Sequence, residues 1–330
     1  MTTFKEIRGT AIQVVSSDPS NRETGQIWYN SSSGTLKGYV FATVNAWASG
    51  GNLSTARNEG GTAGIQTAAI GFGGYVPPNS VTAATESYNG TSWTSGGNLG
   101  TARYRMGRAG TQTAALSVGG GPTVASDTTT TQVESYNGSS WSTNPASLNT
   151  SRKLLAGFGT QTAAIAAGGY SGPPGIVRNS SESYNGTSWT NTSNLNTARG
   201  WFYGAGTQTS GLVVAGYNLS SGTTNVESWN GSAWTNATAY PSSTYFAGVA
   251  GESNTSALVF GGSPATTSTQ NWNGSAWTST TGMSNARQAM FNAGTQTLAL
   301  AAGGWNGGSL IASTEEWTGT QLQTKTVTVS

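Results

Sequence analysis

Short stretches of alternating or continuous apolar residues recur along the chain, and glycine or asparagine bounds most of them. In residues 132–136, Gln-Val-Glu-Ser-Tyr, apolar and polar positions alternate, which predicts a strand with one buried face. The apolar run 113–118 predicts a preceding strand, and Gly110-Thr-Gln-Thr before it predicts a tight turn from a first strand. A fourth strand is predicted to begin at Trp141. Residues 101–141 therefore predict one small antiparallel sheet of four strands.

The same pattern repeats along most of the chain. The tryptophans that begin the predicted fourth strands stand 43–48 residues apart, a period typical of propeller blades or solenoid units. They are Trp47, Trp93, Trp141, Trp189, Trp234 and Trp277. An Asn-Gly pair precedes most of these strands and predicts a hairpin turn with positive φ at both residues. These pairs begin at Asn89, Asn137, Asn185, Asn230 and Asn273, and Thr318-Gly319 takes their place in the last unit.

Two architectures accommodate a repeat of this length. A solenoid is built mostly from helical or single-strand units, whereas each unit here carries hairpin signals throughout. Four short strands per unit are the pattern of one propeller blade. Small residues dominate the predicted second strands, as in Thr162–Ala167, and suit strands crowded around a central axis. The repeat therefore favours an all-β propeller.

The units resemble kelch repeats. The resemblance rests on the double glycine after strand two, the Glu-x-Tyr of strand three, the tryptophan of strand four and the arginine before strand one, and it covers about residues 45–322. The family implies a propeller, and six copies of the first three strands imply six blades. The chain departs from the family where Tyr-Asn-Gly replaces the Tyr-Asp dipeptide. The copper chemistry of kelch-type oxidases needs Cys and His ligands, and this chain has neither.

Either end of the chain could supply the last fourth strand. Residues 41–48 carry Trp47 and lead into the Gly-Gly-Asn-Leu linker that later units share, whereas residues 321–330 alternate well but place Leu322 where tryptophan is expected. We favour residues 41–48. The predicted fold is a six-bladed kelch-like β-propeller over residues 41–330, preceded by a short β segment over residues 1–40.

Residues 1–40 lie outside the repeat. A hairpin is predicted from 25–30 and 35–39 around Ser31–Gly34, with an earlier strand over 4–15. The segment resembles short Gly-x-Ile-x-Tyr-Asn modules of bacteriophage tail and fibre proteins. That resemblance implies an anchoring and assembly segment that pairs with other virion subunits. The alternative is an extension packed against the propeller.

Composition narrows the functional classes. The 330 residues carry a net charge of +2 with only 8% charged residues, which argues against a nucleic-acid-binding protein. With no cysteine and no histidine, disulfides, thiol chemistry, a Ser-His-Asp triad and the usual zinc, copper and haem sites are excluded. We expect no cofactor and no metal. Residues 1–8 have no apolar core, so we expect no signal peptide, and no apolar run of the sequence has the length of a membrane span.

Five arginines recur just before the predicted first strands: Arg57, Arg103, Arg152, Arg199 and Arg287. At the rim of a propeller channel they could bind an anionic ligand. A structural alternative is an ion pair with the glutamate of strand three: Glu86, Glu134, Glu182, Glu227 and Glu315. In the fifth unit Thr244 and Gln270 replace both members together. Joint loss favours the ion pair, because one buried charge without its partner costs about 3–5 kcal/mol.

The loops that follow strand two differ most between units, and they are predicted to share one face of the propeller. Rigid scaffolds commonly carry function on such loops. Four of the loops start with an aromatic residue that could stack on a sugar ring or could simply cover the core: Tyr75, Tyr170, Tyr217 and Trp305. These are the candidate ligand-binding residues. No pair of carboxylates suited to glycoside hydrolysis stands out, so we expect no enzyme.

We therefore expect a bacteriophage virion structural protein, a tail fibre or appendage, whose loop face binds a host-surface glycan or receptor during host attachment, so that carbohydrate binding is expected. Its expected partners are other virion subunits through residues 1–40 and a host-surface glycan. We expect no nucleic-acid partner and no membrane insertion, and a homo-oligomer fits the same role. It would be assembled in the host cytoplasm and reside in the virion. The alternatives are a purely architectural fibre or capsid-decoration subunit and, less favoured, a polysaccharide depolymerase.

Overall fold

The computed structural model describes residues 12–42 and 44–327, and every regular element among them is a strand. The chain divides into two compact units, which are treated separately. One comprises Met1–Asn45 together with Thr318–Ser330, and the other comprises Ala46–Trp317. The expected boundary lay between residues 40 and 41. The structure places it after Asn45 and groups the C-terminal residues with the N-terminal segment.

The smaller unit is built around one four-stranded sheet. Its order is β1 (Gln13–Val15), β2 (Ile27–Asn30), β3 (Thr35–Ala42) and β30 (Gln321–Thr326). The pairing of β2 with β3 confirms the predicted hairpin, and β1 confirms the end of the predicted earlier strand, of which residues 4–11 lie outside the described part of the chain. Strand β30 runs antiparallel to β3 from Ala42↔Gln321 to Lys37↔Thr326. An N-terminal strand and a C-terminal strand are thus paired with each other.

Asp18 organises the polar part of this sheet. Its carboxylate accepts hydrogen bonds from Asn30 Nδ2 at 2.8 Å, Trp28 Nε1 at 3.1 Å and Lys37 Nζ at 3.1 Å. The hydrogen bond from Asn30 and those from Lys37 and Trp28 lower the pKa of Asp18 against the effect of burial. Because Trp28 is fully buried, its indole needs such a partner.

The larger unit contains six four-stranded antiparallel sheets, one for each copy of the repeat, and all four predicted strands are present in each. The first and second sheets contain β5 (Gly61–Ile65), β6 (Ala68–Phe72), β9 (Thr85–Tyr88), β10 (Trp93–Ser95), β11 (Gly107–Gly110), β12 (Ala115–Val118), β13 (Val133–Tyr136) and β14 (Trp141–Thr143). The third and fourth contain β15 (Ala156–Gly159), β16 (Ala164–Ser171), β17 (Ile176–Tyr184), β18 (Trp189–Thr192), β19 (Gly204–Thr207), β20 (Ser210–Val214), β21 (Val226–Trp229) and β22 (Trp234–Asn236). The fifth and sixth contain β23 (Gly248–Ser253), β24 (Ser256–Phe260), β25 (Thr269–Trp272), β26 (Trp277–Thr280), β27 (Phe291–Gly294), β28 (Leu298–Ala302), β29 (Thr314–Thr318) and β4 (Ala46–Gly50). A two-stranded ribbon, β7 (Tyr75–Val76) and β8 (Ser80–Val81), lies in the loop of the first sheet.

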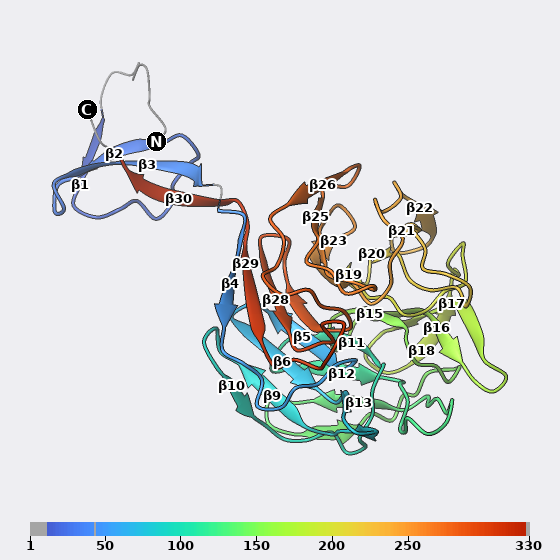
Figure 1. The fold of residues 1–330 in the computed structure, drawn as a ribbon. Coiled ribbons are helices and arrows are strands. Elements are labelled where there is room, and N and C mark those ends of the chain that lie inside the picture. Colours follow the sequence, from blue (N-terminus) through green and yellow to red (C-terminus); the bar gives the residue numbers. More distant parts are fainter. Residues whose placement is uncertain (1–11, 43, 328–330) are drawn as a thin grey trace. The chain divides into compact units, whose positions relative to one another are not determined.

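The first strands of the six sheets contact one another in cyclic order, from β5 through β11, β15, β19 and β23 to β27 and back to β5 (Figure 1). Six backbone hydrogen bonds follow the same cycle. Each runs from the amide of a residue just before the first strand of one sheet to the carbonyl of the equivalent residue of the preceding sheet, at 2.6–3.0 Å. The residues of this cycle, here called the backbone ring, are Glu59, Arg105, Leu154, Trp201, Phe246 and Ala289. This arrangement is consistent with a β-propeller.

Strand β4 occupies the outer position of the sixth sheet, next to β29. Of the two candidate segments, therefore, the one around Trp47 supplies this strand, and Gln321–Thr326 belongs to the smaller unit. The Trp47 side chain packs against Phe260 and Trp317, with ring centroids 5.0 and 5.6 Å away, and its indole donates to Thr269 Oγ1 in the fifth sheet. The N-terminal side of the repeat is thereby tied to its C-terminal sheets.

The hairpins between the third and fourth strands stand where the Asn-Gly pairs predicted them, but their geometry differs from the prediction. In the second sheet Tyr136 pairs with Trp141 across a four-residue loop, and only Gly138 of the Asn-Gly pair has positive φ. The Asn137 side chain instead accepts hydrogen bonds from the amides of Ser139 and Ser140. Asparagine is therefore used for its side-chain carbonyl, which mimics a backbone turn.

The glutamine of the Gly-Thr-Gln-Thr turns connects neighbouring sheets, a role that the sequence did not reveal. Gln161 Nε2 of the third sheet donates to the carbonyl oxygens of Tyr136 at 2.6 Å and Ala115 at 3.2 Å in the second. Gln66 of the first sheet makes the corresponding bonds to Ala299 and Trp317 of the sixth. The sheets are thus linked by side-chain amides as well as by the backbone ring.

Replacing Gln161 with alanine should lower the free energy of unfolding by about 1–3 kcal/mol, because the carbonyls of Tyr136 and Ala115 lose their side-chain donor. Chemical denaturation of the full chain measures this loss. Thr162→Ala is the matched control, since Thr162 is exposed in the same turn, and it should change stability by no more than about 0.5 kcal/mol. Equal effects of the two substitutions would contradict a linking role for the glutamine.

Candidate ligand-binding face

The five recurrent arginines form the ion pairs that their position predicted. Each is 0–1% exposed and contacts the glutamate of strand three in its own sheet. The pairs are Arg57–Glu86 at 2.8 Å, Arg152–Glu182 at 2.5 Å, Arg287–Glu315 at 2.6 Å, Arg103–Glu134 and Arg199–Glu227. Such burial leaves these guanidinium groups without a surface on which to hold an anionic ligand at a channel rim.

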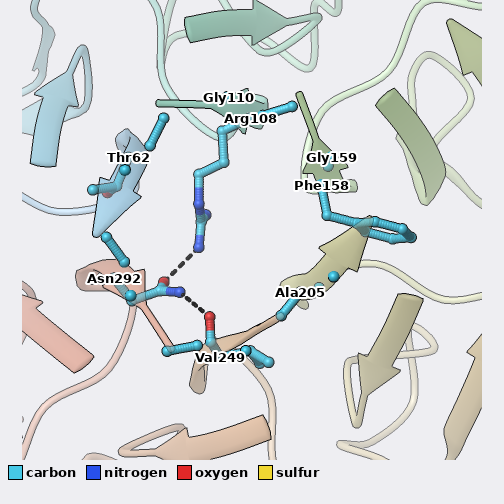
Figure 2. Close-up of a pocket in the computed structure, with 18 residues that line it drawn as sticks. Thr62, Arg108, Gly110, Phe158, Gly159, Ala205, Val249 and Asn292 are labelled. Atoms are coloured by element: carbon cyan, nitrogen blue, oxygen red, sulfur yellow. Dashed lines mark hydrogen bonds between the residues drawn. The ribbon is translucent and has the colours of Figure 1, made fainter. Parts of the chain in front are cut away.

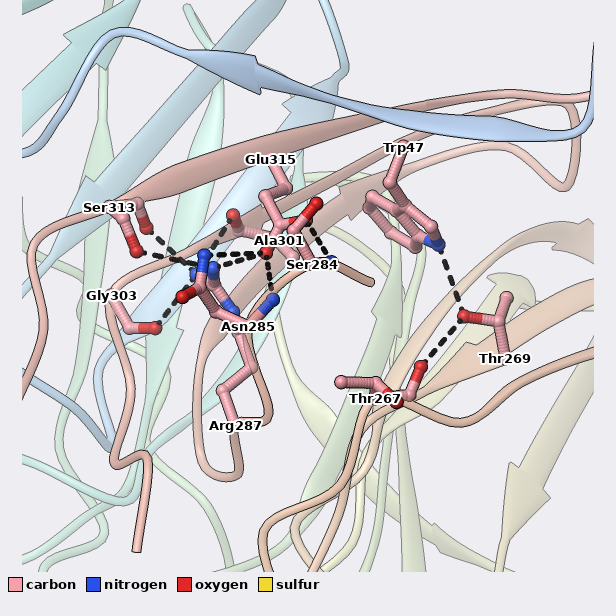
Figure 3. A network of polar contacts seen from close by, with 10 residues as sticks. All are labelled: Trp47, Thr267, Thr269, Ser284, Asn285, Arg287, Ala301, Gly303, Ser313 and Glu315. Carbon is pink, nitrogen blue, oxygen red and sulfur yellow. Dashed lines mark hydrogen bonds and ion pairs between the residues drawn. The ribbon is translucent and has the colours of Figure 1, made fainter. Parts of the chain in front are cut away.

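Figure 3 shows the pair in the sixth sheet. Arg287 Nη1 also donates to the carbonyls of Gly303 and Ser313, while Glu315 accepts from the backbone amides of Ser284 and Asn285. Burial lowers the pKa of Arg287, and the Glu315 carboxylate opposes that shift. The ion pair thus joins three backbone segments within the sheet and its linker.

The fifth sheet replaces this arrangement with neutral groups. Thr244 Oγ1 donates to the carbonyl of Ser263 at 3.1 Å, and Gln270 Oε1 accepts from Ser279 Oγ at 3.0 Å. Both side chains are at least nine-tenths buried. The site therefore tolerates loss of charge when both members change together.

The backbone ring lies where each first strand begins, on the same side as the loops that follow the second strands; this side is called the loop face below. All six ring residues are non-glycine residues with positive φ, between 54° and 59°. Each such conformation costs on the order of 1–3 kcal/mol and persists only where surrounding contacts impose it. Here each ring residue both donates and accepts one backbone hydrogen bond of the cycle, and these contacts hold its backbone in this conformation.

Four aromatic side chains adjoin in a row on the loop face. Tyr170, Trp201, Tyr217 and Tyr245 follow one another with ring centroids 5.5, 5.3 and 5.2 Å apart. Trp201, Tyr217 and Tyr245 are partly exposed, whereas Tyr170 is 8% exposed. This row, the aromatic arc, presents a continuous partly apolar surface supplied by the third, fourth and fifth sheets.

A hollow of about 280 Å³ lies elsewhere on the loop face, between the first and second sheets. Its lining residues are Asn58, Glu59, Tyr75, Tyr104, Arg105 and Val124. Arg105 donates from Nε and Nη2 to the two carboxylate oxygens of Glu59 at 2.8 and 2.9 Å, and its guanidinium lies 4.7 Å from the Tyr104 ring. The hollow thus combines a bidentate ion pair with two phenol rings.

A second set of polar contacts joins the hollow to the arc. Lys153 lies 5.9 Å from the Tyr104 ring and 5.5 Å from the Tyr170 ring, and it pairs with Asp127 at 3.3 Å. Asp127 also accepts a hydrogen bond from the Tyr170 hydroxyl at 3.0 Å. That hydrogen bond and the one from Lys153 lower the pKa of Asp127. The buried Lys153 side chain therefore lies between Tyr104 of the hollow and Tyr170 of the aromatic arc.

The four aromatic candidates from the sequence have different environments. Tyr75 lines the hollow, Tyr217 belongs to the aromatic arc, and Tyr170 is its buried end. Trp305 is partly exposed and bridges through its backbone to Gln288 and Leu310, with no contact that places it in the hollow or the arc. The sequence reasoning missed Tyr104, Arg105, Glu59, Trp201 and Tyr245. A signal was available: each stands one or two residues after the recurrent arginine position.

The described residues show no group of three or more Asp, Glu, Cys or His side chains that could hold a metal ion. The two acidic side chains identified on the loop face, Glu59 and Asp127, are both paired with cations. Over the part of the chain that the structure covers, no helix has the length and apolar character needed to cross a membrane.

No protein-family profile matches this chain, and no curated protein sequence matches it either. Its fold, by contrast, matches 287 chains of solved structures. One of these is the structure of YjhT, which superposes with a TM-score of 0.68 at 13% sequence identity and covers 82% of this chain and 99% of that one. The similarity concerns the fold, because identity at this level carries no site residues with it.

Proposed function

We propose that this protein is a bacteriophage virion structural protein, a tail fibre or appendage, and that its loop face binds a glycan of the host surface. The six sheets would be the blades of a closed, kelch-like propeller completed by β4. One observation carries the binding proposal: the hollow and the aromatic arc lie on one face, on the segments before the first strands and the loops after the second strands, around a hydrogen-bonded backbone ring.

Carbohydrate suits the chemistry of this face. Sugar rings have apolar C–H faces that pack on aromatic rings and hydroxyl edges that need fixed donors and acceptors. The arc offers aromatic rings for such packing through Trp201, Tyr217 and Tyr245. The hollow offers fixed hydrogen-bond donors and acceptors through the Glu59–Arg105 pair and Asn58. We interpret the face as a binding surface without turnover, because its two acidic groups are held in ion pairs.

The smaller unit supports the attachment role. Strand β1 lies at the edge of its sheet, and Val14 on it is 66% exposed. An exposed edge strand with apolar side chains is a template for pairing with another chain. In our proposal other virion subunits, including copies of this chain, pair here, so that this unit anchors the protein and leaves the larger unit to meet the host.

The proposal is tested by measuring binding of the full chain to an array of bacterial surface polysaccharides and to whole cells. Saturable binding is expected. Tyr217→Ala and Tyr75→Ala should each weaken it at least about tenfold, equivalent to about 1.4 kcal/mol. Tyr29→Ala is the matched control, because Tyr29 is 38% exposed on the sheet of the smaller unit and should leave glycan binding unchanged.

Two results would contradict this proposal. Folded protein that binds no polysaccharide or cell, yet is retained on virions, would show the purely architectural subunit. Release of new reducing ends from a bound polysaccharide would show a depolymerase, and the roles of Glu59 and Asp127 would then need to be redefined.

A further inference from the structure

The centre of the larger unit contains a hollow of about 100 Å³, bounded by three consecutive residues from the first strand of every sheet (Figure 2). Its lining is mostly glycine and alanine, as in Gly204–Gly206 and Ala293–Gly294. These strands are the edges of their sheets, so backbone amides and carbonyls without strand partners face this space. We call it the central channel.

One charged side chain enters the central channel. Of the residues that line it, all within the described part of the chain, Arg108 alone is charged. It stands on β11 and is 5% exposed. Figure 2 shows its guanidinium directed across the channel towards Asn292 of β27. The Arg108 Nη2 donates to Asn292 Oδ1, and Asn292 Nδ2 donates to the carbonyl of Val249 at 2.6 Å, which fixes the amide orientation.

Arg108 differs from every other buried arginine of this unit. Arg57, Arg103, Arg152, Arg199 and Arg287 each contact a glutamate, whereas none of the ion pairs among described residues includes Arg108. Its charge is met by the neutral Asn292 amide and by the Tyr203 ring, whose centroid lies 3.8 Å from the guanidinium carbon.

These contacts do not balance the burial of a full charge. The desolvation of a buried ion costs more free energy than one cation–π contact and one hydrogen bond to a neutral amide return. Burial accordingly lowers the pKa of Arg108. Arginine nevertheless remains charged in proteins, so a counter-ion is the expected solution. The adjacent hollow supplies the space, and its size admits an ion of a few atoms but not a sugar.

We propose that the central channel binds a small anion, the size of a halide or a carboxylate, against the guanidinium of Arg108. Asn292 and Tyr203 orient the guanidinium, and the anion accepts hydrogen bonds from its remaining donors. The site is separate from the loop face and does not depend on glycan binding there.

The test is thermal unfolding of the full chain in sodium bromide or sodium formate, at constant ionic strength maintained with sodium gluconate, whose anion is too large for the hollow. A ligand of the folded state raises the unfolding temperature with concentration. We expect such a rise, and Arg108→Gln should weaken the apparent affinity at least about tenfold. Arg178→Gln is the matched control, because Arg178 is a partly exposed arginine of the third sheet and should leave the rise intact.

A crystal of the unaltered protein grown in bromide gives a second readout that does not depend on a variant folding. An anomalous peak beside Arg108 in the central channel would support the site. Equal bromide-dependent stabilisation of Arg108→Gln and the unaltered protein would overturn the proposal, and so would a channel that remains free of bromide in the crystal.

Discussion

Replacing Arg152 alone with threonine should lower the free energy of unfolding by about 3–5 kcal/mol, whereas replacing Arg152 and Glu182 together with threonine and glutamine should cost clearly less. The single change leaves the Glu182 carboxylate buried without its cation, since Glu182 is 1% exposed and Arg152 lies 2.5 Å away. The double change reproduces the Thr244 and Gln270 pair that the fifth sheet already contains. Equilibrium unfolding in urea of both variants measures the difference.

The interaction energy from this double-mutant cycle separates two roles of the arginine. Arg152 also donates to the carbonyls of Gly168 and Ser180. If these bonds dominate, the double variant will be as unstable as the single one, and the ion-pair explanation fails. Glu182→Gln alone supplies the fourth corner of the cycle and should also cost about 3–5 kcal/mol, because it leaves the Arg152 guanidinium buried without its counter-ion.

The second large effect is expected at the strand that the N-terminal side contributes to the sixth sheet. Trp47→Ala should cost about 3–5 kcal/mol, because it removes a side chain that is 9% exposed and packed on Phe260 and Trp317. It also removes the hydrogen bond to Thr269. The unfolding transition of the larger unit, followed by tryptophan fluorescence, measures this loss.

Truncation provides the matched comparison. A chain that ends after Thr320 lacks β30, which belongs to the sheet of the smaller unit, and the transition of the larger unit should be preserved. A chain that lacks Ala46–Gly50 exposes the edge of β29 and should aggregate or unfold at lower urea concentrations. The reverse order of stability would mean that the C-terminal residues, and not β4, complete the sixth sheet.

Much of the fold could be predicted because its signals are local. Alternation in residues 132–136 and the glycines after strand two place strands wherever the repeat occurs, and the ion pairs followed from the joint replacement at Thr244 and Gln270. The turn type was wrong, because Asn137 serves through its side-chain oxygen and not through a left-handed backbone. A dipeptide alone does not distinguish these two uses of asparagine.

The candidate site was less predictable, because its members meet only after the units are arranged around an axis. Trp201 contacts Tyr170 and Tyr217 from different units, and Arg105 contacts Glu59 across 46 positions of sequence. The sequence analysis did not single out Arg108, because its contact with Asn292 joins strands 184 positions apart. The period of the repeat predicts the number of sheets. The composition of the candidate site depends instead on which side chain each repeat carries at equivalent positions.

The pairing of the two chain ends has a mechanical consequence. The larger unit is entered through β4 and left through β29, which are neighbours in one sheet, and the next segments on both sides meet again as β3 and β30. A tensile load arriving through the smaller unit is therefore divided between two covalent connections. While Lys37 to Ala42 stay paired with Thr326 to Gln321, a pull on the smaller unit would load β4 and β29 together, not one of them alone.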